Sequence, residues 1–398
     1  MRETITIQVG QCGNQIGNQF WSQMLHEHEN TPDSDDAMSA FFRFSPQGNG
    51  RPHVMKARAL LVDMECGPLQ ETMRSPLGSL FDDAQFVMDV YGAGNNFAHG
   101  HFEYGPQYRS KFEEGLRKNA EHCDSLQTFF VTHSLSGGTG SGVGTYVLGM
   151  LNDLYPEIYR FAVCVFPSED NDVVTSPYNS VLATKELIEH ADCVLPIDNC
   201  DLQSFAAFEA SQKIKCTGKT KQHLPQISNK SIKDRGFDDM NAIAARMMCH
   251  LTCSSRFHGE MNVDLNEICT NLIPFPKLHF LMTALSPQRT SEIGTLKSST
   301  HHGPGPSGVT ANTSGCRNTM QRSFNDLLSR NGQINGANPL TAGCVTISSA
   351  FIARGTPSHV RLSDFLNCVT NAQKSLTFPK WNQDACKVSW YFVTIRHR

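Results

Sequence analysis

The glycine-rich stretch "SGGTGSG" at residues 136–142 constrains the fold of this chain more than any other feature. Such a run is either a slack linker or backbone that lies very close to a ligand. The segment before it, residues 126–134, is apolar and β-branched, which predicts a buried strand. Apolar residues recur after it at the spacing of one helix face. The stretch therefore reads as the turn between a strand and a helix.

A glycine turn that opens a helix is suited to binding an anion, most naturally a phosphate. Its unpaired backbone N–H groups lie at the positive end of the helix dipole and can donate to the anion, and hydroxyl side chains add further donors. Two known phosphate loops do not fit, however. A P-loop requires a lysine where Val143 stands, and a dinucleotide-binding fingerprint requires a third glycine at the same position.

The first half of the chain alternates strand-like and helical patterns, which predicts an α/β fold with a parallel sheet covered on both faces. The strand-like runs are residues 4–9, 58–62, 85–90, 126–132, 161–166 and 193–197, and two of the helical patterns are residues 15–28 and 177–190. Further polar or glycine-rich turns follow strands at residues 9–17, 62–67 and 91–100. Since ligands gather at the carboxyl ends of parallel strands, four such loops predict one polyphosphate site.

Two acidic residues, Asp63 and Glu65, stand in the second of these turns. Carboxylates beside phosphates would most naturally hold Mg²⁺ or its water ligands. The alternative is that both are solvated loop carboxylates. The net charge of −4 does not suit a whole-protein nucleic-acid binder, and no apolar run is long enough to cross a membrane. We therefore expect neither nucleic acid nor membrane as a partner.

The second half of the chain is organised differently. Residues 211–235 carry seven Lys or Arg and one Asp, which predicts a solvated loop or, alternatively, a patch for an acidic partner. A methionine-rich helical face follows at residues 237–251 and predicts a buried central helix. Two strand-like runs, residues 278–285 and 343–353, then flank a segment rich in Gly, Ser, Pro and Thr, for which we expect a mobile loop.

The fourteen cysteines are scattered and form no Cys-x-x-Cys pair, and we see no signal peptide. We therefore expect reduced thiols in a cytosolic protein. Cys249 and Cys253 have the spacing of one helical turn around His250, but no further ligand follows at zinc-finger spacing. They are predicted to be core residues. His301 and His302 are predicted to be exposed loop histidines.

Five segments in the same order resemble the tubulin family over nearly the whole chain. They are "QVGQCGNQIGNQFW", "GAGNNFAHGH", "THSLSGGTGSGVGT", "SPYNSVLATKELIEHADCVLPIDN" and "NVDLNEICTNLIPFPKLHFLM". Within the family, "DVVTSPYNS" and "EHADCVLPIDN" are most similar to the epsilon subfamily. The resemblance implies a GTP-binding cytoskeletal subunit that assembles with other tubulin subunits in microtubule organisation. The resemblance also implies a location in the cytoplasm, at a microtubule organising centre such as a centriole or basal body.

The resemblance also implies a domain organisation. A nucleotide-binding domain of tubulin-like, Rossmann type is expected at residues 1–236, with a basic insertion at about residues 211–235. The central helix is expected at residues 237–257. A smaller α/β intermediate domain is expected at residues 258–398, with a mobile insertion at about residues 290–316. Because the chain stops soon after the last strands of that domain, the C-terminal helical hairpin of the family is expected to be largely absent.

The resemblance assigns roles to residues around GTP and Mg²⁺. Asp63 and Glu65 match the family's Asp-x-Glu near Mg²⁺. The residues expected around the phosphates are Gln11, Cys12, Asn95, Ser136, Gly137, Gly138, Thr139 and Gly140.

The same comparison places the base and the sugar. Asn199 and Asn241 match the asparagines that read guanine, and Phe237 matches an aromatic residue that stacks on the base. In the loop that contacts the sugar, Asp172 fits, but Ser176 stands where a glutamate usually meets the ribose.

The segment "NVDLNE" carries the implied catalytic residue. Asn262, Asp264 and Glu267 reproduce the Asn-x-Asp-x-x-Glu of alpha-type tubulins, whereas beta-type tubulins have lysine at the last position. In alpha-type tubulins the carboxylate at this position orients and deprotonates the water that attacks the γ-phosphate of the neighbouring subunit. The alternative is that Glu267 is an acid favoured by the helix dipole. For the whole chain, the alternatives are a GTP-binding structural protein that does not hydrolyse and, remotely, an NAD-dependent α/β enzyme.

Overall fold

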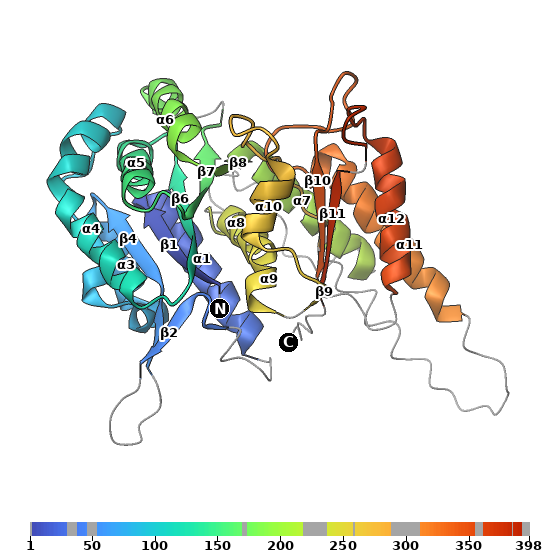
Figure 1. The fold of residues 1–398 in the computed structure, drawn as a ribbon, viewed down its shortest axis with the longest axis horizontal. Helices are drawn as coiled ribbons and strands as arrows, with labels where there is room; N and C mark the ends of the chain where they lie inside the picture. Colours follow the sequence, from blue (N-terminus) through green and yellow to red (C-terminus); the bar gives the residue numbers. More distant parts are fainter. Residues whose placement is uncertain are drawn as a thin grey trace.

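The computed structural model describes residues 2–29, 38–45, 54–168, 173–217, 237–257, 259–287, 311–354, 361–383 and 385–391. Two sheets organise this part of the chain, a large one formed by the first two hundred residues and a small one formed by later segments (Figure 1). Among the described residues, no helix is both long and apolar enough to cross a membrane.

The large sheet has six strands in the order β5-β4-β1-β6-β7-β8, and every pairing is parallel. Its strands are β1 (Glu3–Val9), β4 (Ala59–Asp63), β5 (Phe86–Met88), β6 (Leu126–Ser134), β7 (Tyr159–Phe166) and β8 (Cys193–Asp198). The predicted parallel sheet and its six strands are thus confirmed. From β1 the chain adds strands first on one side and then on the other, so the connectivity reverses between β1 and β6. Such a reversal opens a crevice for ligands at the carboxyl ends of the strands.

Helices cover both faces of this sheet because strand residues alternate between the two faces. Phe129 packs in one apolar core with α4 (Gly105–Glu121), α5 (Gly144–Leu154) and α6 (Ser176–His190). The next residue, Phe130, packs in the other core with α1 (Gly10–His28), α3 (Cys66–Arg74), α7 (Asn199–Thr217) and α8 (Asp238–Leu251). The result is a three-layer α/β arrangement (Figure 1).

The methionine-rich face becomes α8, whose Ile243, Met247 and Met248 are buried against α1 and α7. Phe237, predicted to share this face, instead precedes the helix and is 59% exposed. The predicted core cysteines Cys249 and Cys253 are buried. Helix α7 continues to Thr217, into the basic stretch, and residues 218–236 lie outside the described part of the chain.

The small sheet has the order β10-β11-β9. It consists of β9 (Gly259–Met261), β10 (Ser349–Arg354) and β11 (Cys386–Tyr391), with β11 antiparallel to β9 and parallel to β10. The helices that accompany it are α9 (Cys253–Arg256), α10 (Leu265–Leu272), α11 (Ala311–Leu328) and α12 (Leu362–Ser375). A separate apolar core forms where Phe324, Phe365 and Trp390 meet. Residues 288–310, which include most of the expected mobile insertion with His301 and His302, lie outside the described residues.

The prediction of a regular strand at residues 278–285 is wrong. This segment makes only two isolated bridges, between Val194 and Phe280 and between Ala284 and Gln333. It is hydrogen-bonded to the edge of β8 through the His279 carbonyl and the Leu281 N–H, both at 2.8 Å. It then turns to a different partner, so no continuous ladder forms. The later strand-like run is confirmed only from Ser349 onward.

Shorter elements complete the described fold. They are the antiparallel pair β2 (Phe42–Ser45) and β3 (Val54–Ala57), and the helical turns η1 (Pro76–Leu80), η2 (Asp83–Gln85), η3 (His99–Tyr104), η4 (Thr139–Val143) and η7 (Arg330–Gly332).

A buried ionic cluster joins the large sheet's helices to the small sheet. Glu27 at the end of α1 accepts from Arg256 Nη1 of α9 at 2.7 Å and from Arg354 Nη2 of β10 at 2.5 Å. Both arginines also donate to the Cys249 carbonyl oxygen, at 2.6 and 3.3 Å. Burial alone would raise the pKa of Glu27, but the two guanidinium groups outweigh burial and hold that pKa at about 2. Glu27 is therefore ionised, and its carboxylate links its own helix to two segments that are distant in sequence.

We predict that Glu27→Gln lowers the free energy of unfolding by about 3 kcal/mol, because it leaves two buried guanidinium groups without their counterion. Urea unfolding followed by circular dichroism measures this loss. Glu29→Gln is the matched control, since Glu29 is exposed and its ion pair among the described residues is with His26, at 3.6 Å, and it should change stability by less than about 0.5 kcal/mol. Equal effects of the two variants would contradict the prediction.

The same variant should reveal a pH dependence. Because the folded-state pKa of Glu27 is lowered from 4.5 to about 2, its contribution to stability is complete above pH 4.5. It is lost as the pH falls from 4.5 to about 2, where the carboxylate becomes protonated in the folded protein. The stability difference between wild type and Glu27→Gln should therefore shrink across this window.

Candidate functional site

Four loops meet at the carboxyl edge of the large sheet. They follow β1 at Gly10, β4 at residues 64–65, β5 at residues 89–98 and β6 at residues 135–138. Two contacts show how close the backbones are. A Cβ added to Gly10, whose φ is +75°, would lie 3.2 Å from the Gly140 nitrogen, and one added to Gly138 would lie 2.6 Å from the Asn96 nitrogen. The convergence of the loops predicted from the sequence is therefore present.

The glycines of the stretch after β6 fall into two groups. Added Cβ atoms at Gly138, Gly140 and Gly142 would each lie within 2.6 Å of backbone atoms in neighbouring segments. These three positions require glycine because backbone packs on backbone. Gly137 is different, since an added Cβ would meet nothing closer than Asn95 Oδ1 at 3.8 Å. At Gly94 an added Cβ would meet nothing within 4 Å. Gly137 and Gly94 are therefore the places where a ligand can approach the backbone.

Asn179 of α6 holds two of the loops together. Its side-chain Nδ2 donates to the Asn95 carbonyl oxygen at 2.9 Å and to the Ser136 carbonyl oxygen at 2.8 Å. Its Oδ1 accepts from the Phe97 N–H at 3.0 Å, and the side chain is buried. Thr175 Oγ1 adds a hydrogen bond to the Asn95 carbonyl at 2.6 Å. Asn179 lies in the segment "SPYNS", but no role at the site was predicted for it from the sequence.

Asn95 itself has a φ of +51° and is the only non-glycine residue among the described ones with positive φ. Asparagine tolerates this left-handed conformation better than most residues. The two hydrogen bonds to its carbonyl group hold it there, so its side chain remains free to meet a ligand.

Asn14 performs a similar task in the first loop and was also missed. Its Nδ2 donates to the Gly10 carbonyl oxygen at 2.9 Å and to the Val62 carbonyl oxygen at 3.1 Å. The turn after β1 is thereby fixed to the end of β4. Next to it, Gln11 is exposed, while Cys12 is partly exposed and burial raises the pKa of its thiol to about 12. The Cys12 side chain is therefore a neutral thiol.

Asp63, at the end of β4, is a buried carboxylate that lacks a full set of partners. Its Oδ1 accepts from the Glu65 N–H at 3.3 Å, whereas its Oδ2 is buried and has no hydrogen-bond partner within the described residues. Burial raises its pKa to about 7. Glu65 is exposed and lies beside Gly92 of the third loop. An unsatisfied carboxylate oxygen next to a second carboxylate fits a Mg²⁺ ion, which prefers oxygen ligands.

The residues assigned to the base and the sugar lie further along the sheet edge. Asn199 begins α7, Asn241 is buried in the first turn of α8, and Phe237 caps α8. Helices α7 and α8 pack together. Within the described residues, however, no hydrogen bond or ring contact joins these three side chains to the phosphate loops. Asp172 lies outside the described residues, and Ser176 is buried at the start of α6.

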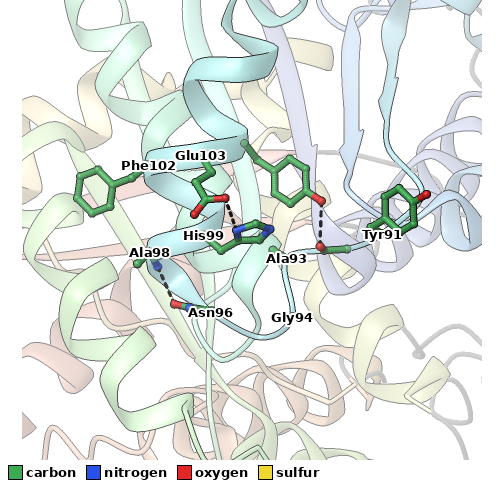
Figure 2. Close-up of a pocket in the computed structure, with 10 residues that line it drawn as sticks. Tyr91, Ala93, Gly94, Asn96, Ala98, His99, Phe102 and Glu103 are labelled. Carbon is green, nitrogen blue, oxygen red and sulfur yellow. Dashed lines mark hydrogen bonds and ion pairs between the residues drawn. The ribbon is translucent and has the colours of Figure 1, made fainter.

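A cavity of about 500 Å³ borders the third loop (Figure 2). It is lined by Tyr91 and the following loop on one side and by η3 on the other. Tyr104 Oη donates to the Gly92 carbonyl oxygen at 3.1 Å and His99 Nδ1 lies 2.8 Å from Glu103 Oε2, as the dashed lines show. A cavity of this size is typical of small-molecule sites, so the loop has open space beside it.

Glu267 lies at the opposite edge of the sheet from these loops. The neighbouring Asn266 Nδ2 donates to Oε1 of Gln127, the second residue of β6, at 3.3 Å. The glycine loop begins after Ser134, seven residues later, which is roughly 23 Å along an extended strand. The Glu267 side chain is 46% exposed, and its Oε2 lies 3.4 Å from Lys387 Nζ of β11. The structure therefore does not bring Glu267 together with the loops of its own chain.

Comparison with known proteins yields consistent matches. A sequence model described as Tubulin/FtsZ family, GTPase domain, matches residues 3–207. The Tubulin epsilon chain of Mus musculus is 40% identical over 412 residues, covering 98% of this chain and 81% of the relative. The Tubulin epsilon chain of Homo sapiens is 40% identical over 407 residues with the same coverage. The Tubulin beta-5 chain of Ectocarpus variabilis is 36% identical over 294 residues, 72% of this chain and 61% of the relative.

The two groups of glycines generate a prediction. Gly138→Ala should lower the free energy of unfolding of the ligand-free protein by about 3 kcal/mol, because backbone atoms cannot yield to the added methyl group. Gly137→Ala is the matched control, since its φ is not in the left-handed region and its surroundings are open. It should leave stability unchanged or raise it by about 0.5 kcal/mol. Thermal unfolding measures both, and similar melting temperatures for the two variants would refute the distinction.

Proposed function

Because the chain belongs to the tubulin family, we propose that it is a GTP-binding cytoskeletal subunit that assembles with other tubulin subunits in a nucleotide-dependent manner. The observation that carries the proposal is the convergence of four loops at one sheet edge, with glycine backbone open at Gly94 and Gly137. No lysine stands in the glycine stretch. Backbone N–H groups and a Mg²⁺ ion would therefore neutralise the phosphates.

In this proposal the phosphates lie among the first, third and fourth loops, with Gln11, Asn95 and Thr139 offering side chains. Asp63 and Glu65 would hold Mg²⁺ or its waters. The support is the buried, unpartnered Oδ2 of Asp63, which a cation would satisfy. When bound, Mg²⁺ supplies a positive charge that offsets the charge of the phosphates.

The base would lie between the starts of α7 and α8. Asn199 and Asn241 carry both donors and acceptors and therefore suit the polar edge of guanine. Phe237, 59% exposed, has a free ring face that suits stacking. We further propose the domain organisation expected from the sequence, with the nucleotide-binding part at residues 1–236, the central helix at residues 237–257 and the intermediate part at residues 258–398.

Glu267 is proposed to act on the nucleotide of the next subunit in an assembly. Its distance from the loops of its own chain, and its half-exposed side chain, support this assignment. Glu267 would accept a proton from the water that attacks the γ-phosphorus of the neighbour's GTP. The bond from the γ-phosphorus to the bridging oxygen breaks, leaving GDP and inorganic phosphate. The intermediate-domain residue Lys387 would hold the carboxylate in place until the subunits meet.

A second possibility is a subunit that keeps GTP without hydrolysing it. The observation that favours it is again Lys387, whose ammonium group lies 3.4 Å from Glu267 Oε2 and offsets the charge of a base. The resemblance to epsilon subunits further supports a location at a centriole or basal body and partners drawn from microtubule or centriole components.

The identity of the bound nucleotide tests the proposal. Purified protein is denatured, and the released small molecules are identified by chromatography and mass spectrometry. We expect GDP or GTP in stoichiometric amount, and much less from Asp63→Asn, which removes the carboxylate for Mg²⁺. Asp83→Asn, at an exposed position, should retain as much nucleotide as wild type. Release of NAD, or of no nucleotide from the wild type, would count against GTP binding.

The catalytic role of Glu267 is tested in co-assemblies with tubulin. Glu267→Gln should lower the rate of GTP hydrolysis by about 100-fold while sedimentation shows that assemblies still form. The control is Glu157→Gln, an exposed carboxylate that precedes β7 at the same edge of the sheet, and its rate should match wild type. Unchanged hydrolysis in Glu267→Gln assemblies would eliminate the catalytic role and favour the non-hydrolysing subunit.

A further inference from the structure

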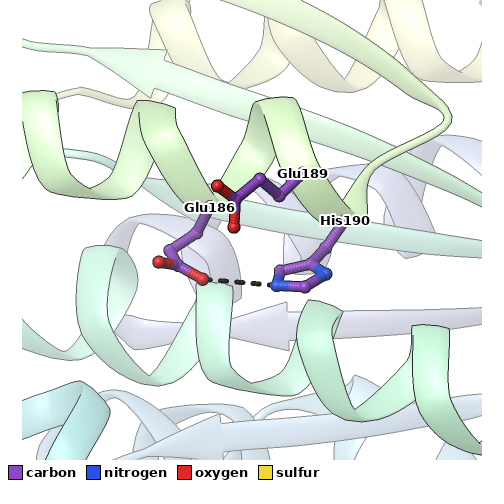
Figure 3. A group of neighbouring side chains, drawn as sticks. All are labelled: Glu186, Glu189 and His190. Carbon is purple, nitrogen blue, oxygen red and sulfur yellow. Dashed lines mark ion pairs between the residues drawn. The ribbon is translucent and has the colours of Figure 1, made fainter.

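The C-terminal part of α6 carries a group of side chains that GTP binding does not use. Glu186, Glu189 and His190 each offer one ligand atom, and these atoms lie within 4.8 Å of one another (Figure 3). Their spacing of three and four residues places them on one face of the helix. His190 Nε2 and Glu186 Oε2 are 3.4 Å apart. The cluster therefore combines an imidazole nitrogen with two carboxylates.

Glu186 and His190 line a cavity of about 170 Å³ together with residues of η3 and α5 and with Arg109 of α4. The side chains of Glu186 and His190 are only 16% and 27% exposed. The His190 ring lies against Gly149 of α5, where an added Cβ would be 3.5 Å from the ring. His190 Nδ1 is buried and has no hydrogen-bond partner in the described part of the chain. The ring is thus held between two helices rather than free in solvent.

A second imidazole, that of His101 in η3, lines the same cavity. Its Nδ1 lies 3.3 Å from the Gly142 carbonyl oxygen and 3.2 Å from Thr145 Oγ1. A carbonyl oxygen can only accept, and the Thr145 hydroxyl already donates to the Ser141 carbonyl oxygen at 2.7 Å. His101 Nδ1 must therefore carry the proton, which leaves the lone pair of Nε2 available. Metal-binding histidines are commonly oriented in this way.

The donor set identifies the class of ion. Mg²⁺ and Ca²⁺ prefer oxygen ligands throughout, whereas an imidazole nitrogen together with carboxylates suits Zn²⁺ and similar divalent transition metals. Lys185 partly compensates the two acids, with its Nζ 3.4 Å from Glu186 Oε1 and 3.8 Å from Glu189 Oε1. Because the Lys185 side chain is 63% exposed, it can move into solvent when an ion replaces it.

We propose that Glu186, Glu189 and His190 bind a Zn²⁺-class ion, beside the cavity that His101 also lines. The cavity beside the site reaches from α6 to η3, where His101 is hydrogen-bonded to Gly142 and Thr145 at the end of the glycine loop. An ion here therefore fixes the His190 ring, which packs on Gly149 of α5, the helix that follows the glycine loop. The site is independent of the GTP proposal, since it shares no ligand with the phosphate loops.

Zinc binding to the full chain tests the proposal. Protein freed of metal by chelator is titrated with ZnCl₂ in competition with a chromophoric chelator, in buffer with a phosphine reductant. We expect one site in wild type that His190→Ala and Glu186→Gln each weaken at least about tenfold. His26→Ala is the matched control, because His26 also pairs with a glutamate on a helix surface, and its affinity should equal that of wild type.

Lys185→Gln should change the affinity for zinc in the opposite direction to His190→Ala and Glu186→Gln, and misfolding of the variant cannot produce this result. Removal of the competing ammonium group should tighten zinc binding, and zinc should raise the melting temperature of this variant more than that of wild type. The proposal is overturned if His190→Ala and Glu186→Gln bind zinc as tightly as wild type. It is also overturned if the sole zinc sites prove to be exposed thiols such as Cys200 and Cys344, shown by loss of binding after thiol alkylation.

Discussion

Close contact between the backbones of separate loops is the constraint on which the rest of this structure depends. Gly10 lies against Gly140, Gly138 against Asn96, and Gly142 against Phe97. These contacts bring the turns after β1, β5 and β6 together where the connectivity of the sheet reverses. Side chains larger than hydrogen would separate the loops. Most glycines of the stretch therefore exist to assemble the site, and only a few positions leave backbone open to a ligand.

The parts of the fold that follow from local pattern could be predicted. Strands such as β4 (ALLVD) and β7 (YRFAVCVF) are short, mainly apolar runs between polar turns, whereas β1 (ETITIQV) alternates polar and apolar residues although every one of them is buried. The segment at residues 278–285 has an equally strand-like pattern, but it pairs with β8 and then with the region of Gln333. Pairing partners are a property of tertiary structure, so local sequence cannot reveal this change.

The residues of the candidate site likewise fall into those that the sequence could identify and those that it could not. Loop positions such as Asp63 and Asn95 could be identified because they directly follow strands. Asn14 and Asn179 could not, because an asparagine in a helix carries no sign that its amide group bonds to a distant loop. Likewise, nothing in the sequence around Glu27 indicates that two arginines more than two hundred residues away share its carboxylate. Long-range polar contacts are therefore the part of the structure that pattern analysis misses.

The shared carboxylate of Glu27 also restricts how this chain can change during evolution. Replacement of Arg256 or Arg354 alone disturbs the balance of buried charges, and the remaining partners cannot restore it. Replacement of Glu27 alone lowers stability further, because two buried guanidinium groups then lack an anion. Any single substitution in the triad of Glu27, Arg256 and Arg354 therefore gives a less stable protein. Exchange for an apolar cluster requires several coordinated substitutions, so the three positions are expected to covary or to remain unchanged together, while the neighbouring exposed pair of His26 and Glu29 drifts freely.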